Sequence, residues 1–262
     1  MLENVFRQRA PVEQAGEPRL AKIETGARIY CVGDIHGRDD LLAEVIGFIA
    51  HDSANAPGRT LTILLGDYID RGPDSAAVLE RLSAGEFPTE FTALLGNHDR
   101  MLLDFLDRPT ALETWRRHGA LETLRSYDVP LAGVLRGAQY AQAQAALRAN
   151  LPERHLAFLQ ACPLVAESGD YYFCHAGVRP HVPLDEQREE DLLWIRQPFL
   201  NFAGSFGKIV VHGHTRVSRP EIRANRINID TGAFATGALS CLILEENTVR
   251  IFSTKESGAG LR

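Results

Sequence analysis

Three apolar runs near the start of the chain each end in a glycine that is followed at once by an oxygen-bearing side chain. The runs cover residues 29–32, 62–65 and 93–95, and the side chains after the glycines are Asp34, Asp67 and Asn97. A short run rich in leucine and β-branched residues and bounded by glycine is typical of a buried strand. The residue just past such a strand lies at the carboxyl edge of the sheet, where α/β folds bind ligands. The pattern therefore predicts that three strands bring these side chains to one edge.

The order of the expected elements favours a mixed α/β fold. Strands are expected at 28–32, 61–65 and 91–95, with amphipathic helices between them. This alternation favours parallel pairing with right-handed crossovers. Helices alone are then expected, at 101–106, 112–127, 138–150 and 153–161. Later strands are expected at 171–174, 208–211, 226–229, 240–244 and 249–252, and the last of them have no helix between them, which favours antiparallel pairing.

This pattern predicts one large domain with a helical insert. We expect the domain to cover 26–256, with the insert at about 99–161. Residues 1–25 mix charged, polar, proline and glycine residues without periodicity, so we expect a loosely ordered arm there. Residues 257–262 are expected to form a short tail.

The composition narrows the classes of partner and compartment. The formal net charge is −6, and a net acid is not attracted to a phosphate backbone or an anionic lipid surface, so neither nucleic acid nor membrane is an expected partner. No apolar run approaches the roughly 18 residues of a membrane span, and residues 1–17 carry no apolar signal segment. The four cysteines form no C-x-x-C pair, which is typical of a reduced, cytoplasmic protein with buried thiols.

Histidines at later strand ends add nitrogen ligands to the predicted edge. His175 and His214 follow two later apolar runs, and His36 lies two residues after Asp34, on the same side of an extended segment. Mixed carboxylate, amide and imidazole ligands suit divalent manganese, iron or zinc. Six ligands are too many for one tetrahedral zinc but suit two ions that share a carboxylate. The candidate ligands are Asp34, His36, Asp67, Asn97, His175 and His214.

Five short motifs containing these residues occur in a fixed order. They are Gly33-Asp34-Ile35-His36-Gly37, Gly66-Asp67-Tyr68-Ile69-Asp70-Arg71-Gly72, Gly96-Asn97-His98-Asp99, His175-Ala176-Gly177 and His212-Gly213-His214-Thr215. The set resembles the motifs of the PPP-type, calcineurin-like metallophosphatases, over residues 33 to about 233. The resemblance implies a four-layer αββα sandwich and two divalent metal ions at the sheet edge, with manganese expected first and iron or zinc as alternatives. Asp99 and Leu95 stand where eukaryotic members have glutamate and arginine, so the chain is more similar to the bacterial and phage serine/threonine phosphatase branch.

The resemblance also implies a role for each matching position. Asp34 and His36 are similar to ligands of the first ion, Asp67 to the bridging carboxylate, and Asn97, His175 and His214 to ligands of the second. His98 is similar to the catalytic histidine and Asp70 to the carboxylate that orients it. Arg71 and Asn97 are expected at the substrate phosphate, as is Arg196, from the segment 191–196 that is similar to the stretch supplying a second arginine in bacterial members.

The expected reaction is hydrolysis of a phosphomonoester by direct attack of a hydroxide that the two ions activate. His98, kept charged by Asp70, is expected to protonate the leaving oxygen. Phosphoserine and phosphothreonine in proteins are the first expected substrates, favoured by Asp70 and by the Gly213-His214-Thr215 ending. The alternative is a nucleotide substrate, as in a symmetrical diadenosine tetraphosphate hydrolase. A hypothesis from a different functional class is that the protein is an inactive metal-binding scaffold.

Other polar residues are expected to have structural roles. Asp99 is expected to cap a helix beginning at Met101. His118 is expected on the surface or a helix face. Trp115 is expected on a solvated face of the helical insert, with the lining of a substrate lid as the alternative. His212 is expected to be structural or to support a neighbouring ligand.

Overall fold

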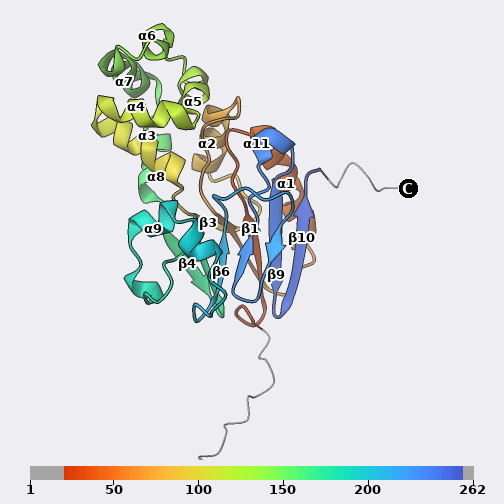
Figure 1. Ribbon diagram of the computed structural model, residues 1–262. Coiled ribbons are helices and arrows are strands. Elements are labelled where there is room, and N and C mark those ends of the chain that lie inside the picture. Colours follow the sequence, from red (N-terminus) through yellow and green to blue (C-terminus); the bar gives the residue numbers. More distant parts are fainter. Residues whose placement is uncertain (1–20, 256–262) are drawn as a thin grey trace, which may run out of the picture.

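The computed structural model describes residues 21–255 and consists of two sheets packed face to face between layers of helices (Figure 1). The first sheet has the strand order β10-β9-β1-β2-β3. Its strands are β1 (Ala27–Val32), β2 (Arg59–Leu64), β3 (Glu90–Ala93), β9 (Ser240–Glu245) and β10 (Thr248–Ser253). Strands β1, β2 and β3 pair in parallel, and β9 and β10 join antiparallel, as the sequence predicts.

The second sheet has the strand order β4-β5-β6-β8-β7. Its strands are β4 (Val165–Ser168), β5 (Tyr171–Cys174), β6 (Ile209–His212), β7 (Glu221–Ile222) and β8 (Arg226–Asn228). The sequence did not indicate β4 and β7, which are edge strands of four and two residues. Strand β8 pairs in parallel with β6, so it does not belong to the antiparallel closing group.

The central strands are buried on both faces because each sheet is covered on both sides. In β1, Ile29 and Cys31 face the core between the sheets, whereas Tyr30 and Val32 face the helices outside. This alternation follows from the two-residue repeat of a strand. The second sheet repeats it, since Phe173 lies between the sheets and its neighbour Cys174 packs under the outer helices. The expected four-layer αββα arrangement is confirmed.

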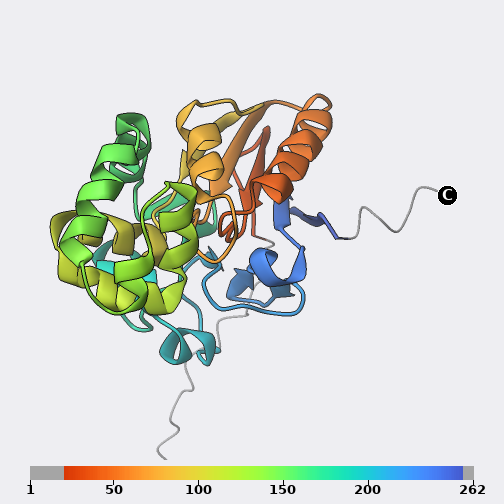
Figure 2. The same cartoon turned by 90° about the horizontal axis from the view of Figure 1, so that it is seen from above.

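The helices form the two outer layers and a separate lobe. Helices α1 (Asp39–Ser53) and α2 (Ser75–Ser83) cover the first sheet, and α9 (Glu189–Trp194) and α10 (Gln197–Leu200) cover the second. The lobe lies beyond α2, at the upper left of Figure 1 and at the left of Figure 2. Its elements are α3 (Asn97–Asp107), η1 (Pro109–Ala111), α4 (Leu112–Trp115), η2 (Arg116–His118), α5 (Ala120–Ser126), α6 (Ala132–Leu135), α7 (Tyr140–Asn150) and α8 (Glu153–Ala161). Short elements complete the fold: η3 (Leu184–Glu186) and α11 (Ala233–Thr236).

Two differences from the predicted helices concern the functional edge. The helix predicted over 112–127 is broken at Gly119, whose φ of +111° is a left-handed conformation that glycine adopts without strain. A Cβ at this position would lie 2.7 Å from Cγ of Arg71, so the glycine also allows the lobe to approach the β2–α2 loop. Helix α3 begins at Asn97 instead of Met101, which places Asn97 and His98 in its first turn.

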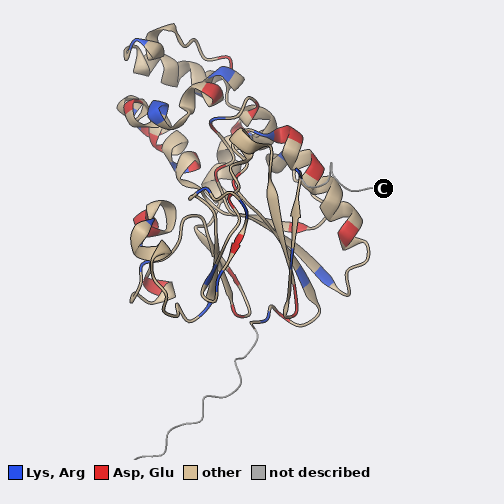
Figure 3. Cartoon of the chain, turned by 45° about the vertical axis from the view of Figure 1, so that its right-hand side comes forward, with Lys and Arg blue, Asp and Glu red and all other residues tan. Residues whose placement is uncertain are grey.

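Charged residues occur throughout the described part of the fold (Figure 3). Figure 3 shows charged residues of both signs on the helices and on the strands. The four cysteines are unpaired, and Cys31, Cys174 and Cys241 are buried. Within residues 21–255, no helix is both long and apolar enough to cross a membrane. Residues 1–20 of the predicted arm and the predicted tail lie outside the described residues, and the division into arm, domain and tail remains a prediction.

Candidate metal centre

The structure brings the six predicted ligands to one edge of the two sheets. Asp34 and His36 follow β1, Asp67 follows β2, Asn97 opens α3, His175 follows β5 and His214 follows β6. All six residues are buried, with at most 8% of their surface exposed. Buried carboxylates and imidazoles at this density require either mutual pairing or a cation. We call these six residues the ligand cluster.

One half of the cluster is formed by Asn97, His175 and His214. Asn97 Oδ1 lies 2.9 Å from His175 Nε2 and 2.8 Å from His214 Nδ1, and the two nitrogens are 3.2 Å apart. Asp67 Oδ1 lies 3.5 Å from the same His175 nitrogen. The potential ligand atoms of Asp67, His175 and His214 all lie within 4.8 Å of one another. This half suits a single ion held by oxygen and nitrogen.

The other half lies on the opposite oxygen of Asp67. Asp67 Oδ2 is 3.5 Å from His36 Nε2 and 3.9 Å from His98 Nε2. These three residues form a second group whose ligand atoms lie within 4.8 Å of one another. The carboxylate of Asp34 instead accepts the backbone N–H of His214, at 3.0 Å from Oδ2. Asp67 therefore stands between the two groups, with one oxygen facing each.

The hydrogen-bonding state of the imidazoles fits a cation. Nδ1 of His36 donates to the carbonyl of Ile69 at 2.8 Å, and Nδ1 of His175 donates to that of Leu65 at 2.9 Å. Burial lowers the pKa of His36 to about 3, that of His214 to about 2, and that of His175 as well, so these rings are neutral. Each Nε2 of His36 and His175 then presents a lone pair to the cluster, with its tautomer fixed by a carbonyl, as is usual for histidine ligands. Nε2 of His214 is buried without a hydrogen-bond partner.

Burial makes ionisation of the carboxylates at the site unfavourable. Burial, together with Asp230 and Asp67, raises the pKa of Asp34 well above its ordinary value. Burial likewise raises the pKa of Asp230 to about 6. A cluster of buried acids beside neutral imidazoles is a donor set that divalent cations stabilise.

The backbone is strained where these side chains are presented. Among residues 21–255, His36, Asp67, Asp70, Arg71 and His214 all have positive φ, between +48° and +74°. Such conformations cost free energy in residues other than glycine and are concentrated at functional sites. Gly213 allows close approach here, since a Cβ at this position would lie 2.0 Å from Oδ1 of Asp34.

A histidine–aspartate pair and two arginines border the cluster. His98 Nδ1 lies 2.6 Å from Asp70 Oδ2, so its Nε2 faces Asp67. Burial opposes protonation of His98, but Asp67 and the hydrogen bond to Asp70 outweigh it and raise the pKa of His98 above its ordinary value. Arg71 reaches Nε2 of His36 at 2.8 Å and Nε2 of His98 at 2.9 Å. Arg196 lies on the other side, with Nη1 3.1 Å from the hydroxyl of Thr215.

Some functional positions were missed or misplaced by the sequence reasoning. Asp99 does cap its helix, because it accepts the N–H of Gly96, but it also accepts the N–H groups of Asp67 and Tyr68 and so holds the loop of the central ligand. An acidic residue at the third helical position was the signal available for this role. Trp115 is fully buried, so the expectation of a solvated face was wrong.

His118 is also closer to the site than expected. Its ring centroid lies 6.0 Å from that of His98, and its carbonyl accepts a hydrogen bond from Arg71 Nε at 3.3 Å. Burial lowers the pKa of His118, with the nearby charge of His98 adding to the effect. No periodicity or spacing in the sequence connects this position with the strand ends.

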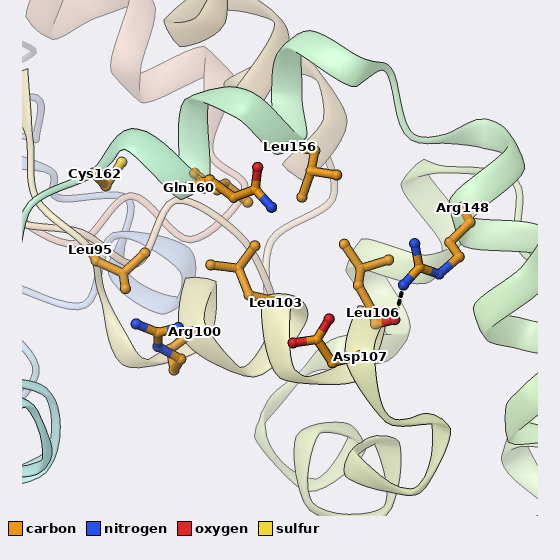
Figure 4. Close-up of a pocket in the computed structure, with 10 residues that line it drawn as sticks. Leu95, Arg100, Leu103, Leu106, Asp107, Arg148, Leu156, Gln160 and Cys162 are labelled. Atoms are coloured by element: carbon orange, nitrogen blue, oxygen red, sulfur yellow. Dashed lines mark hydrogen bonds between the residues drawn. The ribbon is translucent and has the colours of Figure 1, made fainter.

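A separate hollow is lined mainly by residues of α3 and α8, with Arg148 from α7 (Figure 4). It has a volume of about 240 Å³. None of the ligand cluster lines it. Its lining residues are Leu95, Arg100, Leu103, Leu106, Asp107, Arg148, Leu156, Leu159, Gln160 and Cys162.

Comparison with known proteins defines the family. Residues 27–234 match the model of the calcineurin-like phosphoesterases, which is most of the chain. The chain therefore belongs to the calcineurin-like phosphoesterase family, and the resemblance expected from the motifs is confirmed.

Individual relatives differ in what they are named for and in how much of them the chain covers. The chain is 33% identical over 163 residues to the symmetrical bis(5'-nucleosyl)-tetraphosphatase of Acidovorax sp., covering 60% of this chain and 47% of that protein. It is 28% identical to serine/threonine-protein phosphatase 1 of Salmonella typhimurium, covering 81% of this chain and 89% of that protein. The chain thus spans about half the length of the Acidovorax relatives that it matches.

A solved structure supports the fold. The crystal structure of the cold-active protein-tyrosine phosphatase of Shewanella sp. superposes with a TM-score of 0.55, covering 94% of this chain and 89% of that chain. The sequence identity is 15%, so the likeness concerns the fold alone.

Proposed function

We propose that this protein is a metal-dependent phosphomonoesterase and that phosphoserine and phosphothreonine side chains of proteins are its substrates. One arrangement carries the proposal: Asp67 presents Oδ1 to His175 and Oδ2 to His36, each at 3.5 Å. A carboxylate placed between two groups of neutral imidazoles suits two divalent ions that share one ligand. Manganese is the proposed ion, with iron or zinc as alternatives, because the donor set mixes oxygen and nitrogen.

The proposed ligand sets follow the two sides of Asp67. Asp34, His36 and Asp67 would hold one ion, and Asp67, Asn97, His175 and His214 would hold the other. When bound, two such ions lower the pKa of a water molecule and neutralise phosphoryl oxygens. The protein supplies fixed tautomers and a buried, shaped site.

Arg71 and Arg196 are the proposed phosphate-binding residues, together with Asn97. Both guanidinium groups border the ligand cluster, at Nε2 of His36 and at Thr215 respectively. A guanidinium group donates two parallel hydrogen bonds to phosphate oxygens, which fixes both position and orientation. Two arginines on opposite sides would hold a phosphoryl group over Asp67.

His98 is the proposed general acid. Its Nδ1 is held by Asp70 at 2.6 Å, so Nε2 is the atom that faces the substrate side. The raised pKa of His98, which Asp67 and Asp70 produce against the effect of burial, favours an imidazolium that can protonate the leaving oxygen.

A nucleotide is the second candidate substrate, and Trp194 is the observation that favours it. This side chain is 37% exposed, and its ring centroid lies 6.1 Å from that of His214 and 6.0 Å from that of His118. An exposed indole beside a residue of the ligand cluster suits stacking on a nucleobase. The Acidovorax relative is named a symmetrical bis(5'-nucleosyl)-tetraphosphatase, so diadenosine tetraphosphate is the nucleotide that we propose as this second substrate.

One assay separates these proposals. Purified protein with manganese is given a panel of phosphopeptides and, in parallel, diadenosine tetraphosphate, and kcat/KM is measured for each. Asp67→Asn protein purified in the same way controls for contaminating phosphatases. A higher kcat/KM for phosphopeptides supports the first substrate, whereas a higher value for the dinucleotide, lost selectively in Trp194→Ala, replaces it. Absence of turnover with every substrate and every divalent ion tested contradicts the enzyme and supports an inactive scaffold.

A further inference from the structure

Asp70 is held by more partners than the histidine it orients. Its side chain is fully buried, and its φ is +74°. Oδ2 accepts a hydrogen bond from the indole Nε1 of Trp115 at 2.6 Å, in addition to that from His98 at 2.6 Å. Oδ1 accepts a hydrogen bond from the hydroxyl of Thr123 at 2.5 Å. Both oxygens of the carboxylate are therefore engaged.

The additional partners come from the helical insert. Trp115 is the last residue of α4, and Thr123 lies in α5. The two residues follow Asp70 in the chain by 45 and 53 positions. The insert also contacts the next residue, because the carbonyl of Gly119 accepts the backbone N–H of Arg71 at 3.3 Å. The strained turn that carries Asp70 and Arg71 is thus fastened to the lobe as well as to its own sheet.

This geometry restricts how the carboxylate can move. Rotation of Asp70 about its side-chain bonds would break its hydrogen bonds to Trp115 and Thr123 together with the one to His98. Both donors are neutral, and their hydrogen bonds compensate the loss of hydration of the buried carboxylate. The carboxylate is therefore held where it meets Nδ1 of His98 at 2.6 Å.

Packing alone does not account for the orientation of the indole. Trp115 belongs to the outer core of the lobe, where its ring lies 5.4 Å from that of Phe105. A phenylalanine ring would serve that contact, whereas a buried indole N–H needs an acceptor. The acceptor here is the same oxygen that binds the catalytic histidine.

We propose that Trp115 and Thr123 are positioning residues, which fix the carboxylate of Asp70 and through it the direction of His98. The helical insert then contributes to catalysis by positioning Asp70. This inference rests on the proposed function, specifically on His98 as the general acid.

Trp115→Phe tests the inference, because it removes the N–H donor and keeps an aromatic ring. We expect kcat with phenyl phosphate to fall about 10- to 100-fold, the range found when an outer partner of a site residue is removed. The loss should be smaller with 4-nitrophenyl phosphate, whose leaving group needs less protonation. KM and the bound manganese should stay as in the wild type, which separates positioning from general damage to the site.

Two further variants guard against loss of folding. Thr123→Val keeps the shape and removes the hydroxyl, so it should show the same selective loss, whereas Thr123→Ser keeps the hydroxyl and should restore turnover. Tyr127→Phe is the matched control, since Tyr127 donates one buried hydrogen bond within the lobe, to His155, and does not contact Asp70. It should leave kcat unchanged for both substrates.

A double-mutant cycle with His98→Asn decides the question. If Trp115 acts only through His98, Trp115→Phe should cause no further loss in the His98→Asn protein. Two results would overturn the inference and leave the proposed function standing. In the first, the losses of kcat in the two single variants multiply in the double variant. In the second, kcat is unchanged in Trp115→Phe although it falls strongly in His98→Asn. Full turnover in His98→Asn overturns the inference together with the proposed general-acid role of His98.

Discussion

The ligand cluster and the helical insert hold their side chains in different ways, although they meet at one site. In the cluster, the side chains that follow different strands face one another. Their carboxylate, amide and imidazole groups are 2.8–3.5 Å apart, and their lone pairs converge. In the insert, an indole and a hydroxyl donate ordinary hydrogen bonds to a single carboxylate, Asp70. The first region offers a set of donor atoms that could hold a cation, and the second holds one carboxylate in place.

This difference predicts separable defects. Changes in the cluster should remove metal and activity together, because the same atoms hold the ions and define the site. Changes on the side of the insert should lower turnover while metal stays bound. The following predictions are ordered from the largest expected effect to the smallest.

Asp67→Asn should have the largest effect. The substitution removes the charge of the one carboxylate that faces both groups of nitrogen ligands, at 3.5 Å on each side. We expect loss of bound manganese and of nearly all phosphatase activity, measured by metal analysis of the purified protein and by kcat. Two ions per chain in Asp67→Asn, with activity near that of the wild type, would contradict the shared role.

His98→Asn should separate catalysis from metal binding. His98 is fixed by Asp70 and is not needed to complete the proposed ligand sets. We expect kcat to fall by roughly 10²- to 10⁴-fold, the usual contribution of a general acid. Metal content should remain that of the wild type, and loss of manganese in this variant would place His98 among the ligands.

Gly213→Ala should have an intermediate effect on the cluster. A Cβ would lie 2.0 Å from Oδ1 of Asp34, so the loop of His214 must shift. We expect destabilisation of about 1–3 kcal/mol, as for overpacked sites, with weaker manganese binding by calorimetry. Gly47→Ala is the control, because Gly47 lies at an exposed position of α1 and a Cβ there meets no atom within 4 Å. Equal melting temperatures and manganese affinities of Gly213→Ala and the wild type would argue against the close contact.

Tyr127→Phe should have the smallest effect. It removes a buried hydrogen bond of 2.8 Å to His155 inside the lobe, away from Asp70. We expect the free energy of unfolding to fall by about 1 kcal/mol, measured by urea denaturation. A fall in kcat would show that the lobe as a whole, and not its two donors to Asp70, determines turnover.

The same two regions differ in how much of them the sequence predicts. The ligands at the strand ends could be located because each lies within four residues of the end of a strand, as Asp34 and His36 do after β1, which ends at Val32. Strand pairing in the first sheet follows from the alternation of strands and helices, and the family was recognisable from the order of the motifs. These signals are local in the chain.

The contribution of the insert could not be read from the sequence. Trp115 and Thr123 contact Asp70 across 45 and 53 residues, and nothing local marks them apart from other residues of amphipathic helices. The break at Gly119, which brings the lobe against Arg71, shows why: a single left-handed residue redirects two helices that periodicity joins into one. Asp99 lies between these cases, since its capping role was visible and its hold on Asp67 was not.

The central claim is that Asp67 stands between two cation sites. The most direct test is a crystal structure of the protein with manganese, with anomalous difference maps calculated at the manganese absorption edge. We predict two peaks, one on each side of the Asp67 carboxylate, the first beside His36 and the second beside Asn97, His175 and His214. A single peak, or two peaks of which neither lies within bonding distance of Asp67, would contradict the account.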